Sequence, residues 1–114
     1  MSIIDTIEAA YDARPMDRVR VPEWEVKDGP EMMIYYKPAT QHELDVINKA
    51  VPDGATGSRW NTQLVILKSL DESGRRLFSD KDITRLTQKG YSAVISRLAR
   101  VMVAVPSMED AEKN

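Results

Sequence analysis

The stretch KDGPEMMIYY, residues 27–36, decides the fold class of this chain. Its first four residues are a strong turn signal, because Asp and Gly tolerate turn conformations and Pro fixes the backbone angle φ. The residues that follow are rich in strand formers, and Met32, Ile34 and Tyr36 share one face of an extended chain. The stretch therefore predicts the turn and the second strand of a β-hairpin.

The segment before this turn, residues 18–26, predicts the first strand of the hairpin. Apolar and basic residues alternate up to Val21, and after Pro22 the alternation continues through Trp24 and Val26 with the opposite parity. A proline at such a shift is typical of an edge strand with a bulge or bend. A two-stranded hairpin is marginal in water, so its apolar face must pack on helices or pair with a further strand.

The rest of the chain is predicted to be helical. Three pairs of residues have the spacing of a helix-capping box, namely Ser2 with Asp5, Thr40 with Glu43, and Ser79 with Asp82. The segment 59–70 would also suit a buried strand, and its length favours helix. We therefore predict a small α+β domain over residues 1–106, mostly helical with one β-hairpin, followed by a polar tail at 107–114.

Composition excludes several classes of protein. The 114 residues are 42% hydrophobic and 30% charged, which fits a folded domain rather than a disordered chain. The chain has no cysteine, so disulfides and thiolate metal ligands are excluded. Its formal charge of −2 gives no long-range attraction for nucleic acid or membranes. It has neither a membrane-spanning run of about 20 apolar residues nor a signal peptide, so we expect a cytoplasmic protein.

The stretch DESGRRLFSDKD, residues 71–82, crowds carboxylates, a serine and a glycine as calcium-binding loops do. An EF-hand register leaves the first ligand position without a carboxylate and puts Asp80 where a bidentate Glu belongs. The register fails, and we predict no metal site. The stretch instead predicts a turn in which Gly74 takes positive φ and Leu77 and Phe78 enter the core.

We expect neither catalysis nor a cofactor. His42 is the only histidine, and no serine or carboxylate is spaced to form a catalytic pair with it, so we predict that it faces solvent. The five glycines form neither a P-loop nor a dinucleotide-binding fingerprint. The C-terminal half is locally basic and could contact phosphates or an acidic protein surface through Arg75, Arg76, Lys81, Arg85, Lys89, Arg97 and Arg100.

The order of these features is characteristic as a whole. Pro-Glu-Trp at 22–24 is followed by a strand, a capped helix, an apolar helix, the Gly-x-x-Leu-Phe turn ending at Phe78, and an apolar helix with Arg97-Leu98. This order, over residues 15–105, resembles the tail assembly chaperones of long-tailed (siphovirus-type) bacteriophages and prophages. The resemblance implies a non-enzymatic protein of the bacterial cytoplasm. It implies the tape measure protein as partner, and the tail tube protein as a second one.

Such a chaperone needs an exposed apolar or amphipathic surface. We expect one on the outer face of the hairpin and another on the last helix, whose apolar stripe is wide enough to contact both the core and a neighbour. The predicted partner-binding residues are Met33, Tyr35, Val94, Leu98, Val101 and Met102. Self-association through the same surfaces stays open. So do a head–tail connector subunit and a small nucleic-acid-binding regulator, although the net charge argues against the regulator.

Overall fold

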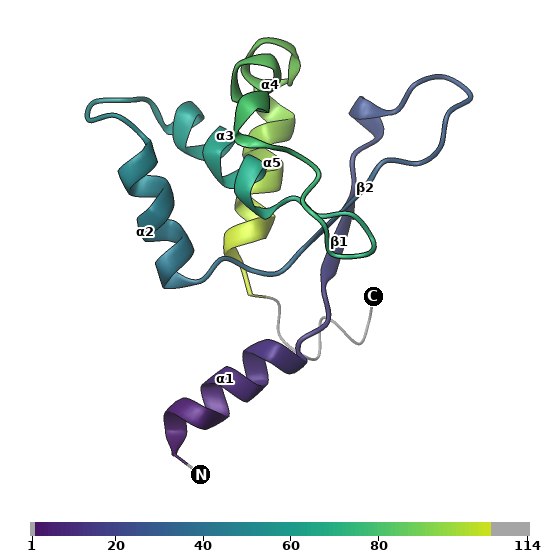
Figure 1. The fold of residues 1–114 in the computed structure, drawn as a ribbon. Helices are drawn as coiled ribbons and strands as arrows, with labels where there is room; N and C mark the ends of the chain where they lie inside the picture. The colour runs from purple at the N-terminus through teal and green to yellow at the C-terminus, as the bar shows by residue number, and fades with distance from the viewer. Residues whose placement is uncertain (1, 106–114) are drawn as a thin grey trace.

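A computed structural model describes residues 2–105 and confirms an α+β domain, mostly helical with one hairpin (Figure 1). The predicted tail at 107–114 lies outside the described residues. Within residues 2–105, no helix has the length and apolar character needed to cross a membrane. The elements, with η marking a short 3₁₀ helix, are α1 (Ile3–Ala13), β1 (Asp17–Arg20), η1 (Pro22–Trp24), β2 (Met33–Tyr36), α2 (Gln41–Ala50), α3 (Gly57–Lys68), η2 (Asp80–Asp82), α4 (Ile83–Lys89) and α5 (Ser92–Val103).

β1 and β2 form the predicted hairpin. They run antiparallel, with Asp17 opposite Tyr36 and Arg20 opposite Met33. The first strand is shorter than predicted, because η1 replaces its second half. Proline at the start of η1 has no N–H for a strand ladder, and its fixed φ suits the first turn of a helix.

The DESG stretch is a turn beside the hairpin. Gly74 has a φ of +91°, as predicted. The carboxylate of Asp71 accepts hydrogen bonds from the backbone N–H and the hydroxyl of Ser73, at 2.9 and 2.7 Å. Just before the turn, Leu70 exchanges two backbone hydrogen bonds with Tyr35 of β2, at 2.7 and 2.9 Å. Within the described part of the chain, no three His, Asp or Glu side chains are grouped to hold a metal ion.

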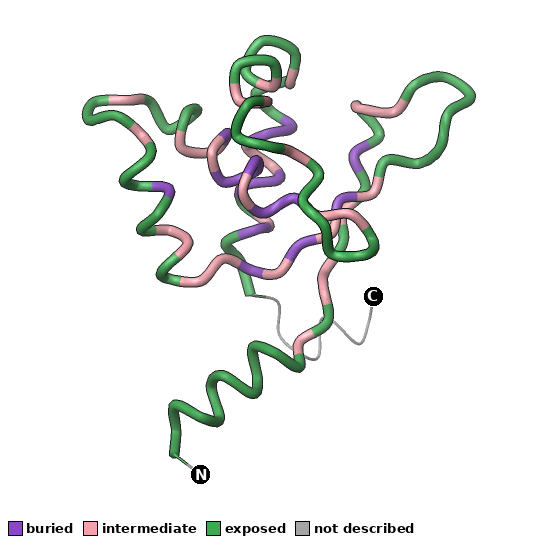
Figure 2. Tube along the Cα trace, viewed as in Figure 1, coloured by how far each residue is buried: buried purple, intermediate pink, exposed green. Residues whose placement is uncertain are grey.

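The core lies between α3, α5 and the inner face of the hairpin, where Figure 2 shows the buried residues gathered. Ile34 and Tyr36 are buried while Met33 and Tyr35 are half-buried, which confirms the predicted inner face of β2. The ambiguous segment 59–70 is helical through Lys68. Two of its buried residues, Leu64 and Val65, belong to the hydrophobic core cluster, which comprises Val21, Ile34, Tyr36, Ile47, Leu64, Val65, Val94, Ile95, Leu98, Ala99 and Met102.

A largely buried ion pair fixes α2 against α3. The ammonium of Lys68 lies 2.8 and 2.9 Å from the two carboxylate oxygens of Glu43, and the Lys68 side chain is only 7% exposed. Burial by itself would raise the pKa of Glu43, but hydrogen bonds from Lys68 and from the backbone N–H of Thr40 outweigh it, and the pKa is lowered. One carboxylate therefore both caps α2 and neutralises a buried lysine.

Candidate functional site

An apolar groove opens between the hairpin and α4. Its volume is about 580 Å³. Its floor is made of half-buried or buried side chains. Met32 and Leu77 are more exposed than the floor and lie at the mouth of the groove. We call this site the Trp24/Phe78 groove; it is lined by Trp24, Met32, Ile34, Leu77, Phe78, Asp82, Arg85, Leu86, Lys89 and Gly90.

Three contacts hold the walls of this groove in place. The rings of Trp24 and Phe78 meet edge to face, with centroids 6.5 Å apart and planes at 85°. Arg97 on α5 donates two hydrogen bonds to the carboxylate of Glu23 on η1, at 2.6 and 2.9 Å. These hydrogen bonds hold the pKa of Glu23 at about 2. Between α4 and α5, Gly90 allows a close approach, since a Cβ there would lie 3.0 Å from the Ile95 side chain on α5, and also 2.7 Å from the carbonyl oxygen of Leu86 on α4.

The rim of the groove carries positive charge. Arg85 and Lys89 are exposed on α4, and neither forms an ion pair with another residue of the described range 2–105. Asp82 is the one carboxylate in the lining, and it accepts a hydrogen bond of 2.8 Å from the backbone N–H of Ser79 as part of the predicted capping box. The groove therefore combines an apolar floor with two basic side chains that have no ion-pair partner among residues 2–105.

A second apolar surface lies on α1, which stands away from the rest of the domain (Figure 1). The predicted Ser2 and Asp5 capping box is confirmed at its start. Every residue of α1 is exposed, and its large apolar side chains share one stripe because Ile7 and Tyr11 follow the pair Ile3 and Ile4 at three, four, seven or eight positions. We call this stripe the α1 face; it consists of Ile3, Ile4, Ile7 and Tyr11, which are 75%, 55%, 56% and 41% exposed.

The structure corrects the predicted outer surface of the last helix. Val94, Leu98 and Met102 are at most 3% exposed, because the apolar stripe of α5 packs on α3 within the same chain. A partner cannot reach these three side chains in the folded domain. Val101 is half-buried against the core, and Met33 and Tyr35 on the hairpin are also half-buried. None of the six predicted partner-binding residues lines the Trp24/Phe78 groove.

The structure also places His42, Leu77 and Phe78, whose surroundings were predicted from the sequence. His42 is exposed on the first turn of α2, as predicted. Phe78 packs against the core, but Leu77 is 40% exposed, so its predicted burial was wrong. The backbone N–H of Leu77 bonds to the carbonyl of Ser69, which places its side chain at the mouth of the groove instead.

The basic C-terminal half is only partly available as a cationic surface. Arg76 lies 3.3 Å from the carboxylate of Asp80, and Arg97 is paired with Glu23. Two of the seven basic residues are therefore neutralised by neighbours. Of the five others, Arg85 and Lys89 belong to the rim of the groove.

This arrangement is suited to binding an amphipathic segment. An apolar floor buries the apolar stripe of an amphipathic segment, and a basic rim attracts carboxylates beside that stripe.

No protein-family model, curated protein or solved structure matches this chain.

Proposed function

We propose that this chain is a non-catalytic assembly chaperone of a long-tailed bacteriophage or prophage. It binds an amphipathic segment of the tape measure protein in the Trp24/Phe78 groove and keeps that protein soluble while the tail tube assembles. The observation that carries the proposal is the groove, an open apolar surface with aromatic residues in its floor. Exposed surfaces of this kind mark sites where a partner binds.

The client chemistry follows from the lining. Trp24, Ile34 and Phe78 offer apolar contact area, and Met32 at the mouth adapts to different client side chains because its thioether is flexible. Arg85 and Lys89 favour clients with Asp or Glu beside the apolar stripe. We therefore expect client segments that are amphipathic helices with an acidic flank.

A binding role, rather than catalysis, is supported by the residues that face the groove. The carboxylate of Asp82 is occupied by the cap of η2, and the two other ionisable residues of the lining are exposed cations. His42, the one histidine, is on α2 and is not part of the lining. The order of sequence features over residues 15–105 supports the tail assembly role in particular.

Co-expression with the tape measure protein of the same gene cluster tests the proposal. We expect the chain to raise the soluble yield of that protein and to co-purify with it. The double variant Met32→Lys with Leu77→Lys should lose both effects, because it places two charges at the mouth of the groove. A matched control is Val46→Lys with Val103→Lys, since those valines are 42% and 41% exposed, against 36% and 40% for Met32 and Leu77.

Two outcomes would contradict the proposal. One is an unchanged yield of tape measure protein together with no co-purification. The other is equal loss of binding in the control variant, which would show that any added surface charge disturbs the complex. Retention of the purified chain on DNA that disappears at high salt would favour the nucleic-acid-binding alternative instead.

A further inference from the structure

We propose that α1 of one copy of this chain docks in the Trp24/Phe78 groove of a second copy. The chain then self-associates through two unlike surfaces, the α1 face and the groove. This inference goes beyond the proposed function and does not depend on it, because it needs only the chain itself.

The first step is that, within residues 2–105, no other element packs over the apolar face of α1 to bury it. It has 11 residues, all of them exposed, and the side chains of Ile3, Ile4 and Ile7 are more than half exposed. Isolated helices of this length are marginal in water, and most helical stability in proteins comes from packing an apolar face. A partner that covers the α1 face would supply that packing.

The second step is charge complementarity. α1 contains Asp5, Glu8 and Asp12 and no Lys or Arg, so all of its charged side chains are acidic. The rim of the groove presents Arg85 and Lys89, which have no ion-pair partner within residues 2–105. The apolar stripe of α1, with its acidic flank, thus complements the apolar floor of the groove, with its basic rim. The α1 of a second copy is therefore the occupant that the charges of this chain specify.

The third step excludes the α1 of the same copy. α1 joins β1 at the end of the hairpin where Asp17 lies opposite Tyr36, whereas Met32 and Trp24 of the groove lie beyond the opposite end of the strands. In Figure 1 the helix points away from the body of the domain. Its last turn is held there by Lys37, whose ammonium lies 3.1 Å from the carbonyl oxygen of Tyr11 and 4.6 Å from the centre of its ring.

The contact is heterologous, so each copy offers one donor surface and one acceptor surface. Such contacts close into rings, or into reciprocal pairs, or continue as open chains, depending on the rotation between copies. The same groove is the client site of the proposed function, so self-docking and client binding would exclude each other. Self-association would cover the groove until a client displaces α1.

A charge-swap experiment tests the inference on the purified full-length chain. Sedimentation velocity over a range of concentrations should show a mass above the 12.9 kDa of one chain, with less association at high salt. Glu8→Lys with Asp12→Lys should abolish association, and so should Arg85→Glu with Lys89→Glu. An equimolar mixture of the two double variants should associate again, because the reversed α1 face then meets the reversed rim.

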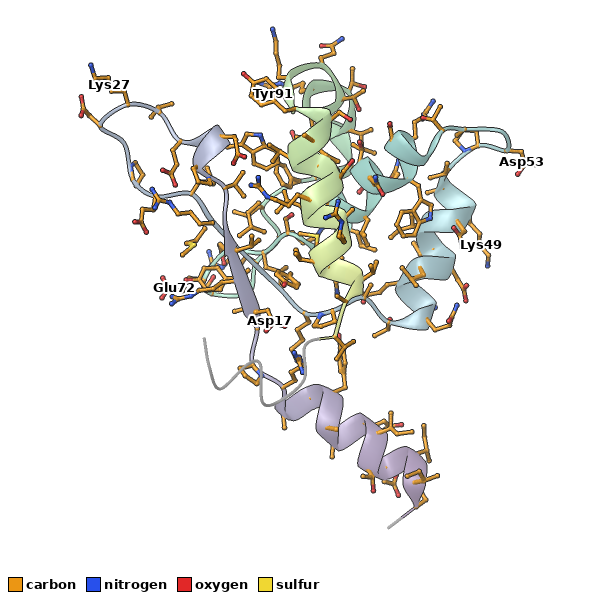
Figure 3. All side chains as sticks on the ribbon, turned by 180° about the vertical axis from the view of Figure 1, so that it is seen from behind. Asp17, Lys27, Lys49, Asp53, Glu72 and Tyr91 are labelled. Atoms are coloured by element: carbon orange, nitrogen blue, oxygen red, sulfur yellow. The ribbon has the colours of Figure 1, made fainter. Side chains whose placement is uncertain are left out.

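Matched controls use exposed charges elsewhere on the surface, which Figure 3 shows at the edges of the molecule. Asp53→Lys with Glu72→Lys changes the net charge as the α1 variant does, and Lys27→Glu with Lys49→Glu changes it as the groove variant does. Both controls should associate like the wild type. Circular dichroism verifies that each variant is folded, and this is expected because every substituted residue is exposed.

Three results would overturn the inference. The wild type could keep the mass of one chain at protein concentrations up to about 1 mM, where even a contact with a dissociation constant of about 1 mM is substantially populated. The α1 or groove variants could associate as strongly as the wild type. The mixture of the two reversed variants could remain monomeric. A failure of client binding would leave these measurements unaffected, because they contain no client.

Discussion

Arg97 and Glu23 form a two-hydrogen-bond ion pair, at 2.6 and 2.9 Å, although they are 74 positions apart in the chain. The pair ties η1 at the end of the hairpin to α5 in the helical part of the domain. Both side chains are partly exposed, at 40% and 36%, so water screens their attraction. The main effect of the pair is therefore positional, because it holds Trp24 in the lining of the groove.

This pair should give the hairpin a dependence on acid pH. The pKa of Glu23 is lowered from 4.5 to about 2, first by the hydrogen bonds from Arg97. A carboxylate with a lowered pKa stabilises the folded state fully above its unfolded value, and that contribution is lost as pH falls toward the folded value. We expect Glu23→Gln to be less stable than the wild type at pH 6, and the difference to shrink between pH 4.5 and 2.

Urea unfolding at several pH values measures this difference. Glu72→Gln is the control, since Glu72 is exposed and no hydrogen bond or ion pair involves its side chain within residues 2–105. The free energy of unfolding of Glu72→Gln should equal that of the wild type at every pH. A gap between Glu23→Gln and the wild type that stays constant down to pH 2 would show that the carboxylate charge is not what matters there.

Replacing Glu43 and replacing Lys68 in their ion pair should lower the free energy of unfolding by different amounts. Glu43→Gln leaves the ammonium of Lys68 nearly buried without a counter-charge, so we expect a loss of about 3 kcal/mol in the free energy of unfolding. Lys68→Met keeps the apolar stem and removes the charge, leaving a half-buried carboxylate that still accepts from Thr40. We expect that loss to be smaller, about 1 kcal/mol.

Chemical unfolding of both variants and of the double variant gives the coupling energy of the pair. The double variant should be more stable than Glu43→Gln alone, because it no longer buries an unpaired charge. Equal losses for the two single variants would mean that solvent reaches Lys68 more freely than its 7% exposure indicates.

Local signals predicted most of the elements. The three capping boxes at Ser2, Thr40 and Ser79 all form, because each is decided by residues three positions apart. Gly74 takes positive φ, and the 27–36 stretch forms the turn and second strand, for the same local reason. The break at Pro22 was recognised, but the turn of helix after it was predicted as strand.

The site could not be predicted in the same way, because it depends on contacts between distant residues. The apolar stripe of α1 and that of α5 look alike in sequence, yet α3 covers only the stripe of α5. Periodicity indicates which face of a helix is apolar and leaves open which neighbour covers it. The groove needs Trp24, Phe78 and Leu86 to converge from three segments, and no spacing in the sequence signals that. In the sequence, Arg85 and Lys89, four positions apart, stand out only as part of a basic region.

Two leucines test the corrected placement of the core. Leu98 is fully buried, so Leu98→Ala should cost about 2–5 kcal/mol through lost apolar contact and a cavity. Leu77 is 40% exposed at the mouth of the groove, so Leu77→Ala should cost less than about 1 kcal/mol. Urea unfolding measures both variants. Similar costs would contradict the burial of α5, and would revive the prediction that Leu98 belongs to an outer surface.

Gly90 and Gly57 should respond to alanine in opposite directions. At Gly90 a Cβ would lie 2.7 Å from the carbonyl oxygen of Leu86 and 3.0 Å from the side chain of Ile95, so the end of α4 must distort and the Ile95 side chain must shift. We expect Gly90→Ala to cost about 1–3 kcal/mol. At Gly57, the first residue of α3, a Cβ meets nothing within 4 Å, so Gly57→Ala should stabilise by about 0.4–1 kcal/mol by restricting the unfolded chain.

Thermal and urea unfolding of the two glycine variants measure these effects. Because α4 carries Leu86 and the basic rim, Gly90→Ala should also weaken whatever binds in the Trp24/Phe78 groove, while Gly57→Ala should leave that binding unchanged. If Gly90→Ala proves as stable as the wild type and binds as well, the close approach of α4 to α5 is not needed, and the groove is less rigid than its contacts imply.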